Sequence, residues 1–227
     1  MNKKYIGIIA AEEKEMLAIK EKMNNIEQIQ IYNLLFFKGN INNKEYILVQ
    51  CGVGKVNAAR TTQILIDKFE IESIINIGSA GGINENLKIG DIVIGEQLVQ
   101  HDFDVTAFGR EKGYVSDTGK FFKSDRSLIE QISKKLKNNQ QKFNVITGTI
   151  ATGDTFLTNI NQKEIIKNEF NCDCIEMEGA AVAQVCTLDN IPFVVIRGIS
   201  DVPNEKNNID FDTYLNIISK RIANSIF

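Results

Sequence analysis

The sequence contains few of the residues from which metal sites and disulfide frameworks are built. Its 227 residues include one histidine, His101, and four cysteines, Cys51, Cys172, Cys174 and Cys186. Cys172 and Cys174 lie two residues apart and His101 has no companion ligand, so no spacing typical of a zinc site occurs. A Cys–His nucleophilic pair would need activating neighbours that the sequence does not show. We therefore expect reduced, mostly buried thiols and no bound metal.

An excess of basic residues and a long apolar run are also missing. The formal net charge of -3 provides no positive field for nucleic acid. No apolar stretch approaches the length of a membrane-spanning helix. The apolar run after Tyr5 is interrupted by Glu12, Glu13 and Glu15, which is unlike a secretory signal. We expect a cytoplasmic protein that binds neither nucleic acid nor membrane.

Length and composition fit one α/β domain. Hydrophobic residues make up 43% and charged residues 24% of the chain, which is ordinary for a globular protein. Only two prolines occur, and no repeat, low-complexity tract or linker divides the chain. We expect residues 1–227 to form a single domain.

Short apolar runs alternate with amphipathic stretches. Asn42-Asn43 predicts a hairpin turn, because asparagine tolerates positive φ. Ser124 or Ser127 is expected to cap a helix, and Ser127 with Glu130 fits a capping box. Glycines at 78–82 predict a loop at the end of a strand. Buried strands are expected at 5–11, 73–77, 91–99, 143–151 and 193–199, hairpin strands at 34–41 and 45–51, and helices from about 12, 57, 127, 161, 179 and 211.

The turn from Gly52 to Asn57 (GVGKVN) resembles a dinucleotide-binding fingerprint, but Asn57 stands in place of the third glycine. A tight turn into a helix explains these glycines without a cofactor. A nicotinamide oxidoreductase therefore has little support.

The segment from Cys174 to Cys186 (CIEMEGAAVAQVC) places two carboxylates before a helix of small residues. Glu176 and Glu178 lie two apart and share one side of an extended strand. Carboxylates at a buried junction are costly unless they are paired or used. One of them could instead interact with the helix dipole.

Several side chains fall just beyond the ends of predicted strands, where α/β sheets bind ligands. They are Glu15, Ser79, Phe156, Glu178 and Asp201. Three are carboxylic acids, and no metal ligands or cofactor loop accompany them.

Motifs along nearly the whole chain resemble those of the 5′-methylthioadenosine/S-adenosylhomocysteine nucleosidases, of the purine nucleoside phosphorylase/uridine phosphorylase superfamily. The resemblance implies a three-layer α/β/α sandwich around a central mixed sheet, and no cofactor. The motifs are GIIAAEEKE (7–15), CGVGKVNAA (51–59), NIGSAGG (76–82), KIGDIVIG (88–95), HDFDVTAFG (101–109), TGDTFL (152–157), IEMEGAAVAQVC (175–186) and VVIRGISDV (194–202).

The resemblance also implies roles for single residues. Glu15 matches the base that activates water, and Asp201 matches the acid that protonates adenine, with Ser200 orienting it. Glu178 matches the carboxylate that binds the ribose hydroxyls. The other matching ligand-binding positions are Ser79, Ala80 and Gly81 near purine and sugar, Phe156 stacked on adenine, Leu157 at its polar edge, Met177 and Arg197 beside Glu178, Val53, Val105 and Phe211 in the pocket lining, and Phe108 reaching across a homodimer interface into the neighbouring site.

These roles suit hydrolysis of the N-glycosidic bond of methylthioadenosine, S-adenosylhomocysteine or 5′-deoxyadenosine, in methionine salvage and S-adenosylmethionine by-product recycling. The leaving base needs a proton while water arrives from the opposite face, as in inverting glycosidases. The chain lacks a proline that some members place near residues 114–116, which leaves the preferred 5′-substituent open.

Two alternatives use the same scaffold. A purine nucleoside phosphorylase would need cationic groups for phosphate, whereas Asn76 stands where related phosphorylases have arginine and Glu15 would repel the anion. A noncatalytic nucleoside-binding protein would need the stacking Phe156 but not both Glu15 and Asp201.

Overall fold

The computed structural model describes residues 5–138, 143–202 and 211–227. Its strands are β1 (Tyr5–Ala10), β2 (Asn24–Ile31), β3 (Leu34–Ile41), β4 (Lys44–Gln50), β5 (Ile71–Gly82), β6 (Ile92–Gln100), β7 (Phe122–Lys123), β8 (Val145–Thr152), β9 (Cys174–Glu176) and β10 (Phe193–Asp201). Its helices are α1 (Glu13–Lys20), α2 (Lys55–Lys68), the 3₁₀ turn η1 (Thr106–Phe108), α3 (Arg126–Asn138), α4 (Ile160–Phe170), α5 (Gly179–Leu188) and α6 (Phe211–Ile226).

The strands form one mixed sheet whose central part closes on itself. β5 pairs in parallel with β1 and β10, and β8 pairs in parallel with β6 and β9. Antiparallel pairs join β10 to β6 and β9 to the end of β5. The pairings β5–β10–β6–β8–β9–β5 therefore make a closed ring, and β1, β4, β3 and β2 extend from it as an open wing.

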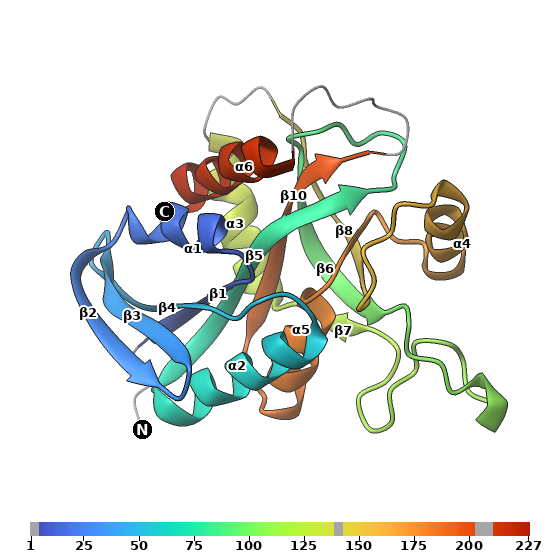
Figure 1. Ribbon diagram of the computed structural model, residues 1–227, viewed down its shortest axis with the longest axis horizontal. Coiled ribbons are helices and arrows are strands. Elements are labelled where there is room, and N and C mark those ends of the chain that lie inside the picture. Colours follow the sequence, from blue (N-terminus) through green and yellow to red (C-terminus); the bar gives the residue numbers. More distant parts are fainter. Residues whose placement is uncertain (1–4, 139–142, 203–210) are drawn as a thin grey trace.

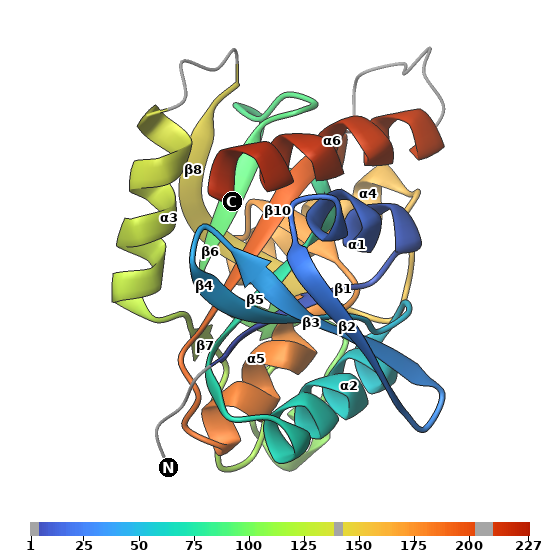
Figure 2. The same cartoon turned by 90° about the vertical axis from the view of Figure 1, so that its left-hand side faces the viewer.

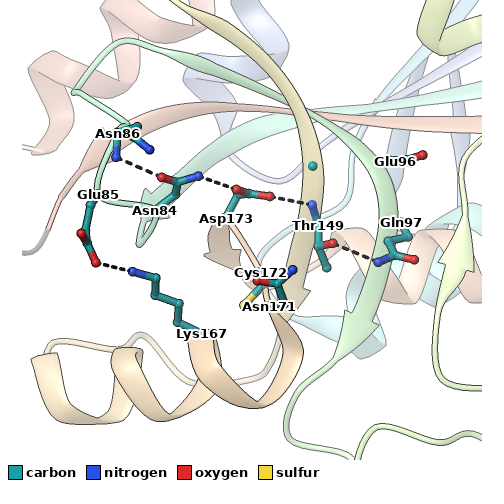
Figure 3. Close-up of a pocket in the computed structure, with 11 residues that line it drawn as sticks. Asn84, Glu85, Asn86, Glu96, Gln97, Thr149, Lys167, Asn171, Cys172 and Asp173 are labelled. Carbon is teal, nitrogen blue, oxygen red and sulfur yellow. Dashed lines mark hydrogen bonds and ion pairs between the residues drawn. The ribbon is translucent and has the colours of Figure 1, made fainter.

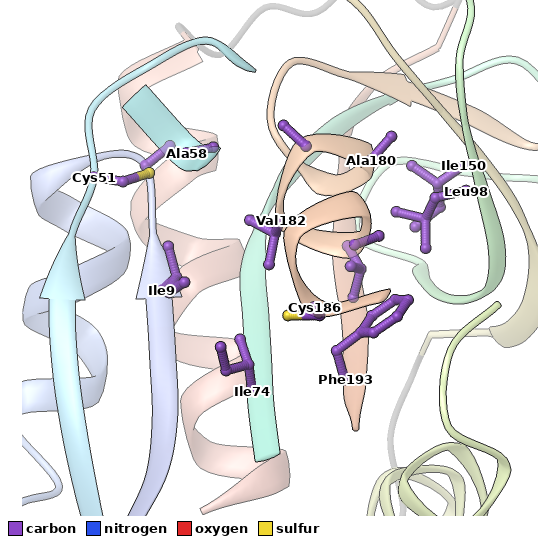
Figure 4. Packing of buried hydrophobic residues seen from close by; sticks show 14 of the residues in the cluster. Ile9, Cys51, Ala58, Ile74, Leu98, Ile150, Ala180, Val182, Cys186 and Phe193 are labelled. Carbon is purple, nitrogen blue, oxygen red and sulfur yellow. The ribbon is translucent and has the colours of Figure 1, made fainter. Parts of the chain in front are cut away.

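Helices cover both faces of the sheet, which confirms the predicted three-layer architecture. Neighbouring residues of one strand enter opposite cores: Ile74 packs with the residues of α2 and α5, and Ile75 with those of α1, α3 and α6. This alternation follows from the period of two in a strand. Figures 1 and 2 show α6 and α1 on one side of the sheet and α2 and α5 on the other. In Figure 4, Val182 and Cys186 of α5 lie near Ile74 and Phe193.

Two local predictions need correction, and one strand was missed. Gly78–Gly82 is not a loop, because β5 continues through it and pairs with β10 and β9. The edge strand β2 was not predicted, since its exposed polar residues give little periodic signal. Asp125, and neither Ser124 nor Ser127, caps α3: its Oδ1 accepts the backbone N–H of Leu128 at 2.9 Å.

The predicted hairpin turn and the burial of the cysteines are confirmed. Asn42 and Asn43 have φ of 49° and 64° in the turn between β3 and β4. The four cysteines are free and buried. Among the described helices, none combines the length and apolar character needed to cross a membrane.

Gly198 in β10 is required for the close packing of α6, and its replacement tests this layer. A Cβ there would lie 2.0 Å from Cγ2 of Ile218. We expect Gly198→Ala to lower the free energy of unfolding by about 1–3 kcal/mol through overpacking, measured by urea denaturation. In an Ile218→Ala background the added methyl has room, so its cost should fall. A fully stable Gly198→Ala variant would contradict this packing.

Candidate active site

A cavity of about 180 Å³ opens at the ends of β1, β5, β9 and β10. A smaller space of about 40 Å³ adjoins it and is lined by Thr155, Leu157 and Lys163 in addition to shared residues. The larger cavity is lined by Ala11, Glu12, Glu15, Val53, Gly78, Ser79, Ala80, Gly81, Phe156, Ile175, Glu176, Met177, Glu178, Ser200 and Asp201.

Glu15 is held in the cavity by backbone donors. Its Oε2 accepts the N–H groups of Ala11 at 3.1 Å and Glu12 at 3.0 Å, and its Oε1 accepts that of Ser79 at 3.0 Å. The side chain thereby satisfies free N–H groups at the start of α1. Burial raises the pKa of the carboxyl above its ordinary value, while the Glu12 N–H and the Arg197 charge oppose the rise. A fixed carboxylate with a raised pKa suits a general base.

Arg197 lies behind the cavity wall and not on it. The side chain is 1% exposed. Its guanidinium forms an ion pair with Glu176, donates to Oδ1 of Asn76 at 2.7 Å and lies 3.9 Å from Glu178. Gly78 permits this position, since a Cβ there would lie 2.9 Å from Nη1. Arg197 was predicted to bind the substrate, but it does not line the cavity. It lies behind the wall and supports the carboxylates of Glu176 and Glu178.

Glu176 has a structural role, because it forms the buried ion pair with Arg197. Such a pair needs further hydrogen bonds to be stable. Besides Arg197, Glu176 accepts the N–H groups of Glu178 at 3.0 Å and Gly179 at 2.6 Å, and the hydroxyl of Thr152. The two N–H groups lie at the start of α5, where a carboxylate also complements the helix dipole, and Thr152 ends β8.

Glu178 has fewer partners than Glu176 and faces the cavity. Its Oε1 accepts the N–H of Gly54 at 2.8 Å, which brings the turn before α2 to the site. Burial, and then the negative charge of Glu176, raise the pKa of Glu178 to about 7, against the opposing charge of Arg197. The two glutamates of one motif thus have different environments.

Asp201 ends β10 on the side of the smaller space. Its Oδ1 lies 3.0 Å from the hydroxyl of Ser200, and its Oδ2 lies 3.0 Å from Nζ of Lys163. Gly81 leaves room for this carboxyl, since a Cβ there would lie 3.2 Å from Oδ2. Phe156, 66% exposed, and Val53, 44% exposed, line the larger cavity and provide apolar surface for a flat ligand.

The structure brings most of the predicted residues together, with three exceptions besides Arg197. Val105 and the 84% exposed Phe108 lie in the segment around η1 and do not line the cavity. Phe211 begins α6, and its side chain lies outside the described part of the structure. In Figure 1 the segment around η1 (green, lower right) projects from the body of the protein.

Sequence reasoning missed Lys163, which lines the smaller space. A signal was present: Lys163, Ile166 and Phe170 recur at helical spacing, and a lysine in an apolar stripe requires a partner. Gly78, Thr155 and Ile175 also border the site and carried no chemical signal of their own.

A larger surface cavity of about 480 Å³ lies elsewhere, between α4 and β8 (Figure 3). Its polar groups bond one another: Asp173 accepts from Asn84 at 2.7 Å and from the N–H of Thr149 at 2.8 Å, and Lys167 donates to Glu85 at 2.7 Å. These bonds connect the segment after β5 to α4 and to the segment before β9, which is a structural role. Within the described ranges, no group of three or more His, Cys, Asp or Glu residues is placed to hold a metal ion.

Comparison with known proteins shows the family to which the chain belongs. Residues 5–226 match the family model of the phosphorylase superfamily. The chain is similar to a 5′-methylthioadenosine/S-adenosylhomocysteine nucleosidase of Geobacillus sp. (strain WCH70), at 41% identity over 225 residues, with 97% of this chain and 95% of the relative covered.

Two solved structures are similar over nearly the whole chain. The Neisseria meningitidis 5′-methylthioadenosine/S-adenosylhomocysteine nucleosidase in complex with methylthio-immucillin-A has a TM-score of 0.93 and 36% identity, covering 98% of this chain and 96% of that one. The futalosine hydrolase of Helicobacter pylori has a TM-score of 0.91 and 33% identity, covering 99% and 96%.

The raised pKa of Glu178 predicts a stability that depends on pH. Because the fold favours the protonated carboxyl, its contribution is complete below the ordinary pKa of 4.5 and is lost as pH rises through about 7. Glu178→Gln keeps an acceptor for Gly54 and cannot ionise. We expect the variant to match wild type at pH 4.5 and to exceed it at pH 8 by roughly 2–3 kcal/mol, measured by urea denaturation.

The matched control is Glu176→Gln, which leaves Arg197 without its ion-pair partner. It should lose stability at both pH values, as removal of one partner of a buried pair does. Equal pH dependence of Glu178→Gln and wild type would contradict the environment assigned to Glu178.

Proposed function

Since the chain belongs to the phosphorylase superfamily and, within it, to the 5′-methylthioadenosine/S-adenosylhomocysteine nucleosidases, we propose that it hydrolyses the N-glycosidic bond of 5′-methylthioadenosine and S-adenosylhomocysteine. The products are adenine and the 5′-thio-substituted ribose. 5′-Deoxyadenosine is a further substrate of the same chemical type. Such a reaction serves methionine salvage and the recycling of S-adenosylmethionine by-products.

The observation that carries this proposal is the set of three carboxyl groups around one cavity. Glu15, Glu178 and Asp201 line it from the ends of different elements, and each has different partners. Glycosidic cleavage requires a base for water, a group that stabilises positive charge on the sugar, and an acid for the leaving base.

The reaction assigns one step to each group. Glu15 accepts a proton from water as the water oxygen bonds to C1′ of the ribose. The C1′–N9 bond breaks, its electron pair goes to the purine, and Asp201 donates a proton at N7. Glu178 accepts hydrogen bonds from the ribose hydroxyls, and these bonds strengthen as positive charge develops on the sugar. Phe156 provides a surface on which adenine stacks.

Hydrolysis is favoured over phosphorolysis by the charges around the nucleophile. Asn76 is buried and bonded to Arg197 and to the carbonyl of Ile9 at 3.0 Å. Arg197 is already paired with Glu176. A phosphate beside Glu15 would therefore meet a carboxylate without a free guanidinium to offset the repulsion.

Futalosine hydrolysis is a second candidate because the solved structure of that name shares 33% identity with this chain. Measuring kcat/KM for futalosine and methylthioadenosine side by side decides between them. A preference for futalosine would replace the primary proposal.

A homodimer completes the proposed site. Phe108 is 84%, Val56 77% and Leu188 55% exposed, and apolar surface of this kind favours a protein partner. Val56 and Leu188 border a depression of about 380 Å³ between α2 and α5. We assign Phe108 to the neighbouring subunit's 5′-substituent pocket and Val105 to the lining of the ligand pocket. The free cysteines support a reducing, cytoplasmic location.

The nucleophile is tested with Glu15→Gln in buffers with and without phosphate. An amide cannot accept the proton of water, so we expect kcat for adenine release to fall at least about 100-fold. Wild-type activity should not respond to phosphate. The exposed Glu13→Gln, on the same turn of α1, is the control and should retain activity. Detection of a ribose 1-phosphate by chromatography would overturn the hydrolytic assignment.

Subunit sharing is tested by complementation. Phe108→Ala should raise KM for methylthioadenosine, and the exposed Ile217→Ala on α6 should not. When Phe108→Ala and Glu15→Gln subunits are mixed and refolded together, mixed dimers contain one site with both native residues. Measured as kcat/KM, the activity should return toward about a quarter of wild type, because half of the dimers are mixed and one of their two sites is intact. If light scattering shows a monomer and that monomer has full activity, this assembly is excluded.

A further inference from the structure

Lys163 occupies an unusual place for a lysine. It lies on the inner face of α4 with Ile166 and Phe170, and it is 8% exposed. A buried ammonium is costly unless it is paired. Its Nζ lies 3.0 Å from Oδ2 of Asp201, whose side chain remains 31% exposed.

The surroundings of this pair are acidic and closely packed. The described residues lining the two joined cavities include the carboxyls of Glu12, Glu15, Glu176, Glu178 and Asp201, and Lys163 supplies the one ammonium among them. A Cβ on Gly81 would lie 3.4 Å from Nζ of Lys163 and 3.2 Å from Oδ2 of Asp201. The pair therefore packs against the backbone at Gly81.

We propose that Lys163 is a positioning residue that holds the Asp201 carboxyl toward the leaving base and stabilises the carboxylate left when Asp201 gives its proton to N7. This inference rests on the proposed function. When the proton leaves Asp201, negative charge appears on the carboxyl, and an ammonium 3.0 Å away attracts it. The proton goes to the purine, the C1′–N9 electron pair goes with the purine, and Lys163 keeps all its protons.

The role of Lys163 follows from the change in charge on the Asp201 carboxyl during the reaction. With substrate bound, Asp201 has to carry the proton that it donates, and an ammonium attracts a carboxylate more strongly than a neutral carboxyl. The Lys163 contact therefore strengthens as the proton leaves, and it acts on the transition state more than on the bound substrate. Ser200 holds the other carboxyl oxygen at 3.0 Å, so the two neighbours fix the carboxyl at both ends. The predicted signature is a loss of kcat with little change in KM.

The experiment compares Lys163→Met with wild type on two substrates. The first is methylthioadenosine, whose base needs a proton. The second is a 5-methylthioriboside of 4-nitrophenol, whose leaving group departs as a phenolate. We expect kcat for methylthioadenosine to fall by about tenfold to a hundredfold, a fraction of what a general acid contributes. The rate on the nitrophenyl riboside should stay near wild type, and Lys163→Arg should recover most of the loss.

Lys167→Met is the matched control, since Lys167 lies one turn further along α4 and pairs with Glu85 at 2.7 Å, away from the site. It should act as wild type on both substrates. Full activity of Lys163→Met, or equal loss on both substrates, would overturn the proposal. If Lys163→Met does not fold, Lys163→Gln takes its place with the same expectations.

Asp201→Asn separates the two levels of inference. If wild type releases adenine and Asp201→Asn does not, the proposed function holds whatever Lys163 does. In the Asp201→Asn background, Lys163→Met should cause no further loss on methylthioadenosine. Failure of wild type to release adenine, or an active Asp201→Asn enzyme, refutes the proposed function itself.

Discussion

The buried ion pair between Arg197 and Glu176 is the constraint on which the site depends. Arg197 belongs to β10, Glu176 ends β9, and Asn76, which accepts from the same guanidinium at 2.7 Å, belongs to β5. The pair thus joins three strands of the closed ring below the ligand cavity. A guanidinium of this kind has to be satisfied on all sides, because an unpaired buried charge is strongly destabilising. Its position in turn requires Gly78, which leaves the space that it fills.

This cation also explains how several carboxyl groups share one cavity. Arg197 lowers the cost of ionising Glu15 and Glu178, but burial outweighs it and raises the pKa of both. Glu176 takes the nearest donors, and its negative charge then adds to the burial of Glu178. The molecule gives up folding stability near neutral pH at Glu178 to keep a hydrogen-bonding carboxyl in the site. Such local conflicts with stability are expected where function is located.

Much of the candidate site could be predicted because its polar residues lie in short sequence motifs. The carboxyls of Glu15, Glu178 and Asp201 each follow an apolar run, and parallel strand ends converge at one edge. The course of β5 through Gly78–Gly82 could not be predicted from glycine content, because pairing with β9 and β10 decides it and those strands are distant in sequence. The burial of Arg197 was missed for a similar reason. Its partners Asn76 and Glu176 lie 121 and 21 residues away, and nothing local distinguishes it from a ligand-binding arginine.

The same ion pair bears on the choice of nucleophile. A scaffold shared with phosphorylases can accept phosphate only if cationic donors are free to face it. Here the guanidinium of Arg197 donates to Asn76 and pairs with Glu176. Its charge is therefore neutralised within the cavity wall and does not face a nucleophile. The remaining ammonium of the described lining, Lys163, points to Asp201 at 3.0 Å, the residue assigned to the leaving base and not to the nucleophile. The position that faces Glu15 is therefore left to a neutral molecule. Water is the nucleophile that meets this condition, because it carries no charge to be repelled and offers a proton that Glu15 can accept.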